Sequence, residues 1–168
     1  MGKRKTYIPK SFESAKPYTK SGDTYAAIYK SMRLSNAWQD LSPKQHDLYV
    51  CCKSEYYGKG RHDLDQFNNY FTDNGIEKNS HPEYFTMNWG KVKRPDGLYA
   101  LYTNSNSFYS DMASLIDHGF IDCVICGADA RAKSLYKLSD RWQRYGTEQY
   151  EVPEEVKTIA LRGTRKWK

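Results

Sequence analysis

The chain has 168 residues, a formal net charge of +6 and an aromatic content of 15%. This length fits one domain of ordinary size, and so many large rings are typical of a folded chain rather than a disordered one. No apolar run is long enough to predict a membrane-spanning helix, and no apolar segment follows the basic start of the chain as it would in a signal peptide. We therefore expect a folded, cytoplasmic protein that does not contact a membrane.

The positive charge is concentrated at the two ends of the chain. Residues 1–20 carry a net charge of +5 and residues 153–168 carry +3, so the residues between them are slightly acidic, at −2. Basic arms of this kind often follow nucleic-acid phosphates, although they also act as solubilising tails. We expect a basic flexible arm at 1–20, a folded domain at 21–147 and a C-terminal basic helix or tail at 148–168.

The first part of the chain predicts a strand and then a well-marked helix. Residues 24–29 (TYAAIY) have the β-branched and aromatic content of a short strand. A helix is predicted to begin at Ser42 and Pro43, because serine is a favoured N-cap and proline suits the first helical position, and to end before Gly58. Its inward face is predicted from residues at helical spacing, which are Gln45, Leu48, Tyr49, Cys52 and Tyr56.

The middle of the chain gives weaker signals. Residues 63–71 are compatible with one short helix and residues 73–75 with a turn, whereas residues 85–89 fit either a strand or the start of a helix. Residues 91–94 form a small basic cluster that ends in a turn at 95–97.

A helix is predicted next, at residues 105–118. Cap-forming residues precede it, and Gly119 is expected to end it in the left-handed conformation. Its inward face is predicted from four apolar residues, which are Phe108, Met112, Leu115 and Ile116.

The rest of the chain predicts a β-hairpin and two short helices. The hairpin consists of strands at 120–125 and 134–138, joined by a turn at 127–132. The short helices are expected to begin at Ser139 and Val152. A first helix, a central helical pair and a hairpin together form the pattern of a winged helix-turn-helix.

Four cysteines raise the question of a metal site. Cys123 and Cys126 have the spacing of a zinc knuckle, but the residues between them are apolar and strand-like. Cys51 and Cys52 are neighbours on a helix, so their side chains point about 100° apart. Residues 62–65 (HDLD) suggest a hard-cation site at first sight, but a solvated loop or helix start explains them better. We expect reduced, metal-free thiols and no cofactor.

Sequence motifs of common enzymes are absent. The chain has no phosphate-binding glycine loop, no Gly-x-Ser-x-Gly, no His-Glu-x-x-His and no dinucleotide-binding fingerprint. We expect that the protein is not an enzyme.

Three segments carry a resemblance to a known family. Residues 35–42 (SNAWQDLS), the run from 107 to 121 (SFY, then LIDHGFI) and residues 139–142 (SDRW) occur in the same order as in that family. The chain resembles, over residues 24–147, small winged-helix proteins encoded on plasmids, phages and conjugative elements of Gram-positive bacteria, which are relatives of replication-initiator DNA-binding domains.

The resemblance implies an α+β winged helix-turn-helix fold with a C-terminal β-hairpin wing, flanked by the basic arms. Helix 105–118 then becomes the recognition helix and residues 127–133 the wing. The implied groove contacts are Asn104, Asn106, Ser107, Tyr109 and Ser110. The implied wing contacts are Arg131 and Lys133, with further phosphate contacts from Lys91, Lys93 and Arg94.

The predicted recognition helix differs from that of a strong DNA reader, because it has no Arg or Lys and carries Asp111 and Asp117. The function expected from the resemblance is double-stranded DNA binding, in replication or transcription control of a mobile genetic element. The alternative is a mobile-element effector that binds a host or element-encoded protein, such as an anti-CRISPR inhibitor of a nuclease. In that case Asp111 and Asp117 are the expected interaction face.

Overall fold

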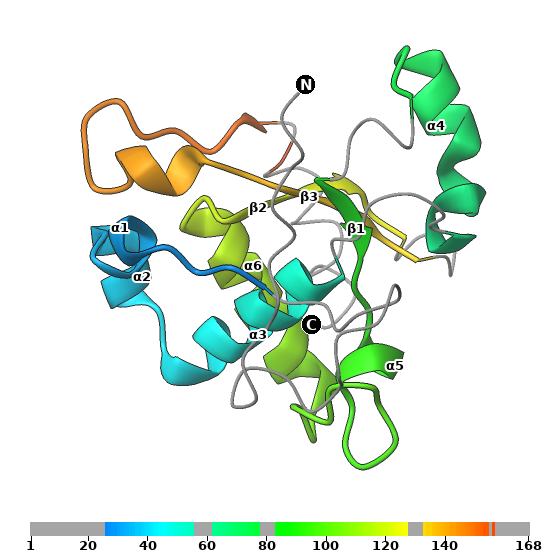
Figure 1. Cartoon of the computed structure of the whole chain (residues 1–168), viewed down its shortest axis with the longest axis horizontal. Coiled ribbons are helices and arrows are strands. Elements are labelled where there is room, and N and C mark those ends of the chain that lie inside the picture. Colours follow the sequence, from blue (N-terminus) through cyan, green and yellow to red (C-terminus); the bar gives the residue numbers. More distant parts are fainter. Residues whose placement is uncertain (1–25, 56–61, 78–82, 128–132, 155, 157–168) are drawn as a thin grey trace, which may run out of the picture.

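The computed structural model describes residues 26–55, 62–77, 83–127, 133–154 and 156. Within these ranges the chain is an α+β protein, in which helices cover a small antiparallel sheet (Figure 1). The elements, in chain order, are α1 (Lys30–Arg33), α2 (Asn36–Asp40), α3 (Pro43–Ser54), η1 (His62–Phe67, a 3₁₀-helix), α4 (Asn68–Asp73), β1 (Tyr84–Thr86), α5 (Trp89–Val92), α6 (Ser105–Asp117), β2 (Ile121–Ile125), β3 (Leu135–Leu138) and η2 (Arg141–Arg144, a 3₁₀-helix).

Helix α3 begins where the sequence predicted. Ser42 and Gln45 form a capping box: the backbone N–H of Gln45 donates to the Ser42 hydroxyl, and the N–H of Ser42 donates to the Gln45 side chain at 2.8 Å. Pro43 occupies the first helical position. Leu48, Tyr49 and Cys52 are buried, which confirms the predicted inward face, whereas Tyr56 and Gly58 lie outside the described residues.

Helix α6 is also as predicted. The Asn104 side chain caps its start by accepting from the N–H groups of Asn106 and Ser107. Gly119 follows its end with a φ of 79°, which confirms the left-handed C-cap. The four predicted core residues, Phe108, Met112, Leu115 and Ile116, are all buried.

The three strands form an antiparallel sheet in the order β1-β3-β2. Strands β2 and β3 are the predicted hairpin, and β1 is paired to the far edge of β3, with Phe85 opposite Tyr136. Residues 85–89 satisfy both readings of that segment, because β1 ends at Thr86 and α5 begins at Trp89. Most of the predicted turn at 127–132 lies outside the described residues.

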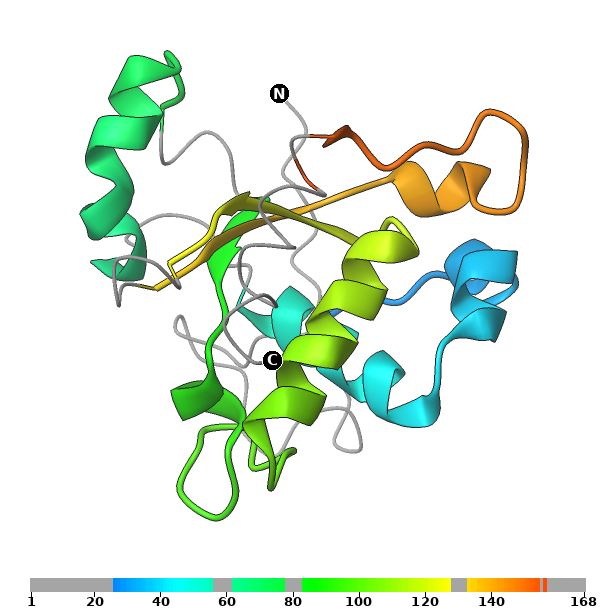
Figure 2. The same ribbon diagram turned by 180° about the vertical axis from the view of Figure 1, so that it is seen from behind.

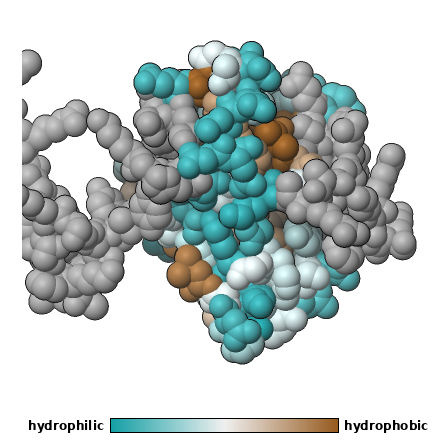
Figure 3. Space-filling model, turned by 90° about the vertical axis from the view of Figure 1, so that its right-hand side faces the viewer, coloured by the Kyte–Doolittle hydropathy of each residue, from teal (hydrophilic) through white to brown (hydrophobic). Residues whose placement is uncertain are grey.

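Alternation along the strands gives the sheet two apolar faces. On one face Phe85, Ile121 and Tyr136 belong to the main core, which α3 and α6 complete. On the other face Tyr84 and Leu135 pack with apolar residues of η1 and α4, which are Leu64, Phe67 and Phe71. The sheet is therefore a middle layer, with α3 and α6 on one side and η1–α4 on the other (Figure 1). Figure 3 faces the η1–α4 side and shows a largely hydrophilic outer surface there.

One predicted element is wrong. Residues 26–29, the described part of the expected strand at 24–29, have no regular structure, and α1 begins at Lys30. A β-prone composition stabilises a strand only where a sheet edge and a face to pack against are present. Tyr29 is 68% exposed, and none of the described strands pairs with residues 26–29. Among the described residues, no helix has the length and apolar character required to cross a membrane.

Candidate nucleic-acid interface

The outer face of α6 is open at its N-terminal half. Figure 2 shows α6 in front, with α3 behind it. Asn106, Ser107 and Ser110 are exposed on this outer face, opposite the buried apolar stripe. They line a shallow cleft of about 530 Å³, together with Ser42 and Lys44 at the start of α3 and with Asp111. Three of the predicted groove contacts are therefore brought together on one surface.

Asp111 is half-buried, and both of its carboxylate oxygens accept hydrogen bonds from within the fold. Its Oδ1 accepts from Gln45 Nε2 at 2.9 Å, and its Oδ2 accepts from the hydroxyl of Tyr102 at 2.7 Å. Tyr102 is fully buried, and burial, followed by the hydrogen bond to Asp111, raises the pKa of its hydroxyl well above the usual range. The Asp111 carboxylate thus joins α6 to α3 and to the loop before α6.

Asp117 lies on a different side of the helix from Asp111. The two residues are six positions apart, which corresponds to about 120° around an α-helix. Asp117 is exposed, and its backbone carbonyl accepts from the hydroxyl of Tyr150. Asp111 is half-buried with both carboxylate oxygens hydrogen-bonded within the fold, whereas Asp117, seven positions after Ser110, is exposed on the same outer side of α6 as Ser110. That the two residues form one protein-interaction face stays a prediction.

Two further predicted groove contacts have structural roles instead. The Asn104 side-chain oxygen is the N-cap of α6 and accepts from two backbone N–H groups. Tyr109 is half-buried and packs on Phe108, with ring centroids 4.8 Å apart. Burial, and to a smaller extent Cys126, raises the pKa of Tyr109. We therefore exclude both side chains from the open face of α6.

Lys91 was predicted as a phosphate contact, but its ammonium group faces inward. Its Nζ lies 2.5 Å from Glu55 Oε2 and also donates to the backbone oxygen of Thr86 at 2.9 Å. Tyr99 donates to the other oxygen of Glu55 at 2.6 Å. This half-buried network joins the end of α3 to β1 and α5, so Lys91 is a structural cation.

The remaining predicted cations are at the surface. Arg94 is exposed, and Lys93 is partly exposed beside Asp96, with 3.8 Å between Nζ and Oδ2. Such an exposed pair contributes little to stability and is easily exchanged for another anion. Lys133 is exposed just before β3, at the loop end of the hairpin. Arg131 lies outside the described residues.

Lys44 is a surface cation that the sequence reading missed. It is exposed near the start of α3, and its Nζ lies 4.5 Å from the centroid of the Tyr102 ring. The Ser-Pro-Lys run around it indicates only a helix start. No local pattern indicates that α3 begins beside the open face of α6, because that neighbourhood arises from tertiary packing.

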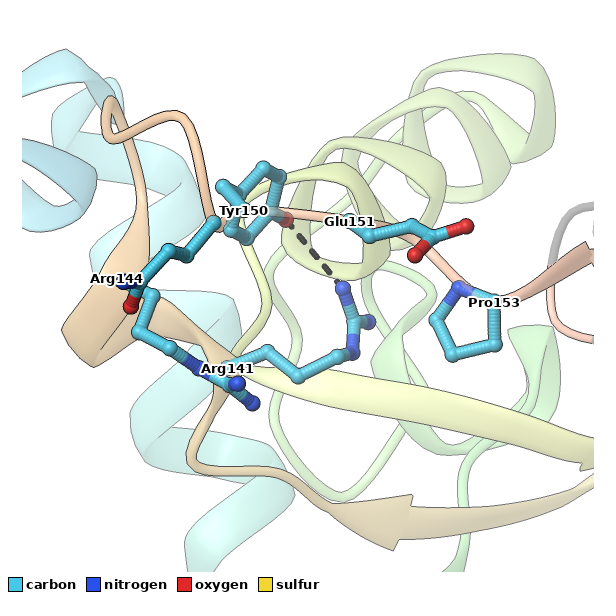
Figure 4. A pocket seen from close by; sticks show the side chains of 6 residues that line it. Arg141, Arg144, Tyr150, Glu151 and Pro153 are labelled. Carbon is cyan, nitrogen blue, oxygen red and sulfur yellow. Dashed lines mark hydrogen bonds between the residues drawn. The ribbon is translucent and has the colours of Figure 1, made fainter.

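A second cavity, of about 310 Å³, lies between η2 and the segment after it (Figure 4). Its lining includes Arg141, Arg144, Tyr150 and Glu151. The buried Arg141 guanidinium already donates to Asp122, to two backbone oxygens and to Tyr150. This cavity therefore surrounds a structural arginine whose donors are in use.

The described residues contain no group of three or more His, Cys, Asp or Glu that could hold a metal ion. All four cysteines are free thiols. Burial is the main cause that raises the pKa of Cys51, to about 11, and that of Cys123 well above its usual range. Residues 62–65 fall in η1, where Asp63 accepts from the buried Thr86 hydroxyl at 2.9 Å.

Compared with protein-family models, with curated proteins and with solved structures, the chain matches none.

Proposed function

We propose that this chain is a winged helix-turn-helix protein of a mobile genetic element that binds double-stranded DNA through α6, in control of replication or transcription. The observation that carries the proposal is the open face of α6, where Asn106, Ser107 and Ser110 project from the surface. Asparagine can pair with both major-groove atoms of adenine, and serine can donate to or accept from any base edge. Small side chains also allow a helix to approach the floor of the groove.

The order of the elements supports the proposal. A helix (α3), a strand (β1), two helices (α5 and α6) and a hairpin (β2 and β3) follow one another, with β1 on the far edge of β3. This is the order expected of a winged helix-turn-helix domain, in which α6 is the recognition helix. The η1–α4 layer is an addition between the first helix and the first strand.

The connection between α5 and α6 differs from the short turn of a simple helix-turn-helix. Residues 93–104 form a loop that folds back on α5: the N–H of Arg94 donates to the Tyr102 carbonyl at 2.7 Å, and the N–H of Leu101 donates to the Val92 carbonyl at 2.8 Å. These bonds fix the start of α6 beside α5 without a tight turn.

The surface cations support backbone binding. Lys93, Arg94 and Lys133 are available for phosphates, and the basic ends of the sequence add further positive charge. The four free thiols fit a reducing, cytoplasmic compartment, where the DNA of a bacterial element is found. The alternative, an effector that binds a host protein, depended on a joint face of Asp111 and Asp117, and Asp111 is bound internally.

The proposal is tested by placing a negative charge on the open face. A labelled DNA duplex of mixed sequence is titrated with the wild type, with Ser110→Glu and with Asn69→Glu. Both residues are exposed, but Asn69 lies in α4, on the other side of the sheet. We expect Ser110→Glu to weaken binding at least about tenfold and Asn69→Glu to leave it within about twofold. Equal effects of the two variants, or no binding by the wild type at low salt, would reject the proposal.

A further inference from the structure

Lys44 is held in place without a carboxylate partner. Its Nζ lies 4.5 Å above the Tyr102 ring, and no ion pair of Lys44 is found among the described residues. The Tyr102 hydroxyl donates to Asp111, which makes the ring more electron-rich and so a better support for a cation. The charge is therefore oriented by the fold and at the same time accessible to an anion from solvent.

Hydroxyl donors from α6 line the same cleft. Ser107 and Ser110 lie one helical turn apart on the open face. Within the described part of the chain, neither hydroxyl has a hydrogen-bond partner, so both are available to donate. An ammonium group with two hydroxyls beside it is a donor set that suits a phosphate group, which accepts several hydrogen bonds and carries a negative charge.

Asp111, which also lines the cleft, has both of its carboxylate oxygens engaged. One accepts from Gln45 and the other from Tyr102, and both of these donors belong to the packed interface between α3, α6 and the preceding loop. Its charge is partly compensated by these two bonds. Lys44, Ser107 and Ser110 carry donors that no hydrogen bond among the described residues uses, and so does the side-chain amide of Asn106.

We propose that Lys44, Ser107 and Ser110 form a seat for one backbone phosphate of bound DNA, at the edge of the groove that α6 enters. This inference rests on the proposed function. It adds a contact from the first core helix, so that α3 fixes the depth and angle of α6 on the duplex. It also supplies, from a neighbouring helix, the cation that α6 itself lacks.

The matched control is another lysine that lies over a tyrosine. Lys137 Nζ is 5.7 Å from the centroid of the Tyr84 ring, on the sheet face that packs beneath η1 and α4. Binding of a mixed-sequence duplex is measured from about 50 to 200 mM salt for the wild type, Lys44→Gln, Lys44→Arg and Lys137→Gln. Thermal unfolding of each variant confirms that it is folded.

We expect Lys44→Gln to make the slope of log affinity against log salt shallower by about one unit. Lys44→Arg should retain the slope, because arginine keeps the charge, and Lys137→Gln should not change it. If the wild type binds DNA and Lys44→Gln keeps its full slope, the seat is rejected while the proposed function stands. An equally shallow salt slope in Lys137→Gln also rejects the seat, because the effect then comes from the total charge of the protein. If the wild type binds no DNA, the proposed function fails first and the seat fails with it.

A free phosphate ion presents the same chemistry as a backbone phosphate. Inorganic phosphate is therefore titrated in place of the duplex, while the backbone amide NMR signals of Ser107 and Ser110 are followed. We expect the duplex to shift both signals at micromolar concentration and inorganic phosphate to have little effect. Shifts with inorganic phosphate but none with the duplex would contradict a DNA seat.

Discussion

Arg141 and Asp122 form a nearly buried ion pair that joins η2 to β2. The Arg141 Nη2 lies 2.5 Å from Asp122 Oδ1, and the same guanidinium donates to the backbone oxygens of Ile116, at the end of α6, and Ile121. One side chain therefore connects the last turn of α6, the first residue of β2 and the segment after β3. This connection holds the hairpin at a fixed angle to α6.

Replacing Arg141 should strongly destabilise the fold. Arg141→Met leaves the Asp122 carboxylate without its cation and two backbone oxygens without a donor, so we expect a loss of about 2–4 kcal/mol in the free energy of unfolding. Arg144→Met is the control, because Arg144 is exposed in the same short helix, and it should cost less than about 0.5 kcal/mol. Urea unfolding of both variants measures the difference, and similar losses would contradict the role given to Arg141.

Gly119 is required by both its conformation and its surroundings. Its φ is 79°, and a Cβ at this position would lie 2.6 Å from the backbone nitrogen of Trp142. Gly75 also has a positive φ, of 63°, but nothing lies within 4 Å of its Cβ position. We expect Gly75→Ala to cost about 1 kcal/mol, from backbone strain alone, and Gly119→Ala at least about 2–3 kcal/mol, because strain and overlap add. Equal costs in thermal or urea unfolding would show that the close approach to η2 is not important.

The hydrogen bond from Tyr102 to Asp111 should matter more than a similar bond at the surface. Tyr102→Phe leaves one oxygen of a partly buried carboxylate unsatisfied, and we expect it to cost about 1–2 kcal/mol. Tyr145 donates to Asp40 at 3.1 Å on the exposed surface, so Tyr145→Phe should cost less than about 0.5 kcal/mol. The comparison is made by urea unfolding at neutral pH. A larger loss in Tyr145→Phe would overturn this reading of Asp111.

Stability should fall in alkaline solution. Burial raises the pKa of Cys51 from 9.0 to about 11 and that of Tyr84 from 10.0 to about 12. As the pH rises above about 9, the unfolded chain loses these protons while the folded chain keeps them, so the unfolded state is favoured. The contribution of Cys51 is complete below pH 9.0 and is lost by about pH 11. Urea midpoints across this range should decrease, and Cys51→Ala should decrease less steeply than the wild type. Identical slopes would contradict the shift at Cys51.

Local signals account for the elements that the sequence predicted well. The start of α3 depends on Ser42, Pro43 and Gln45, which are close in sequence, and the end of α6 depends on the conformational freedom of Gly119. These features are determined by hydrogen bonds and backbone geometry within a few residues, so a single sequence contains them. The strand expected at 24–29 failed because strand formation requires a distant partner.

The roles of charged residues were harder to predict, because they depend on distant contacts. Asp111 bonds to Gln45, 66 positions earlier, and Lys91 bonds to Glu55, 36 positions earlier. The sequence context predicts a surface charge for both residues, but both are half-buried and hydrogen-bonded within the fold. Lys44 was missed for the reverse reason: its sequence context marks a helix start, whereas packing places it beside α6.

The central claim is that the open face of α6 contacts DNA, and NMR mapping of the wild type tests it most directly. A mixed-sequence duplex is added to isotope-labelled protein, and the shift of every assigned amide signal is recorded. We predict the largest shifts at Asn106, Ser107 and Ser110, with smaller ones at Lys93 and Arg94, and little change in α4. Shifts centred on α4, or none at any residue of α6 in low salt, would contradict the account.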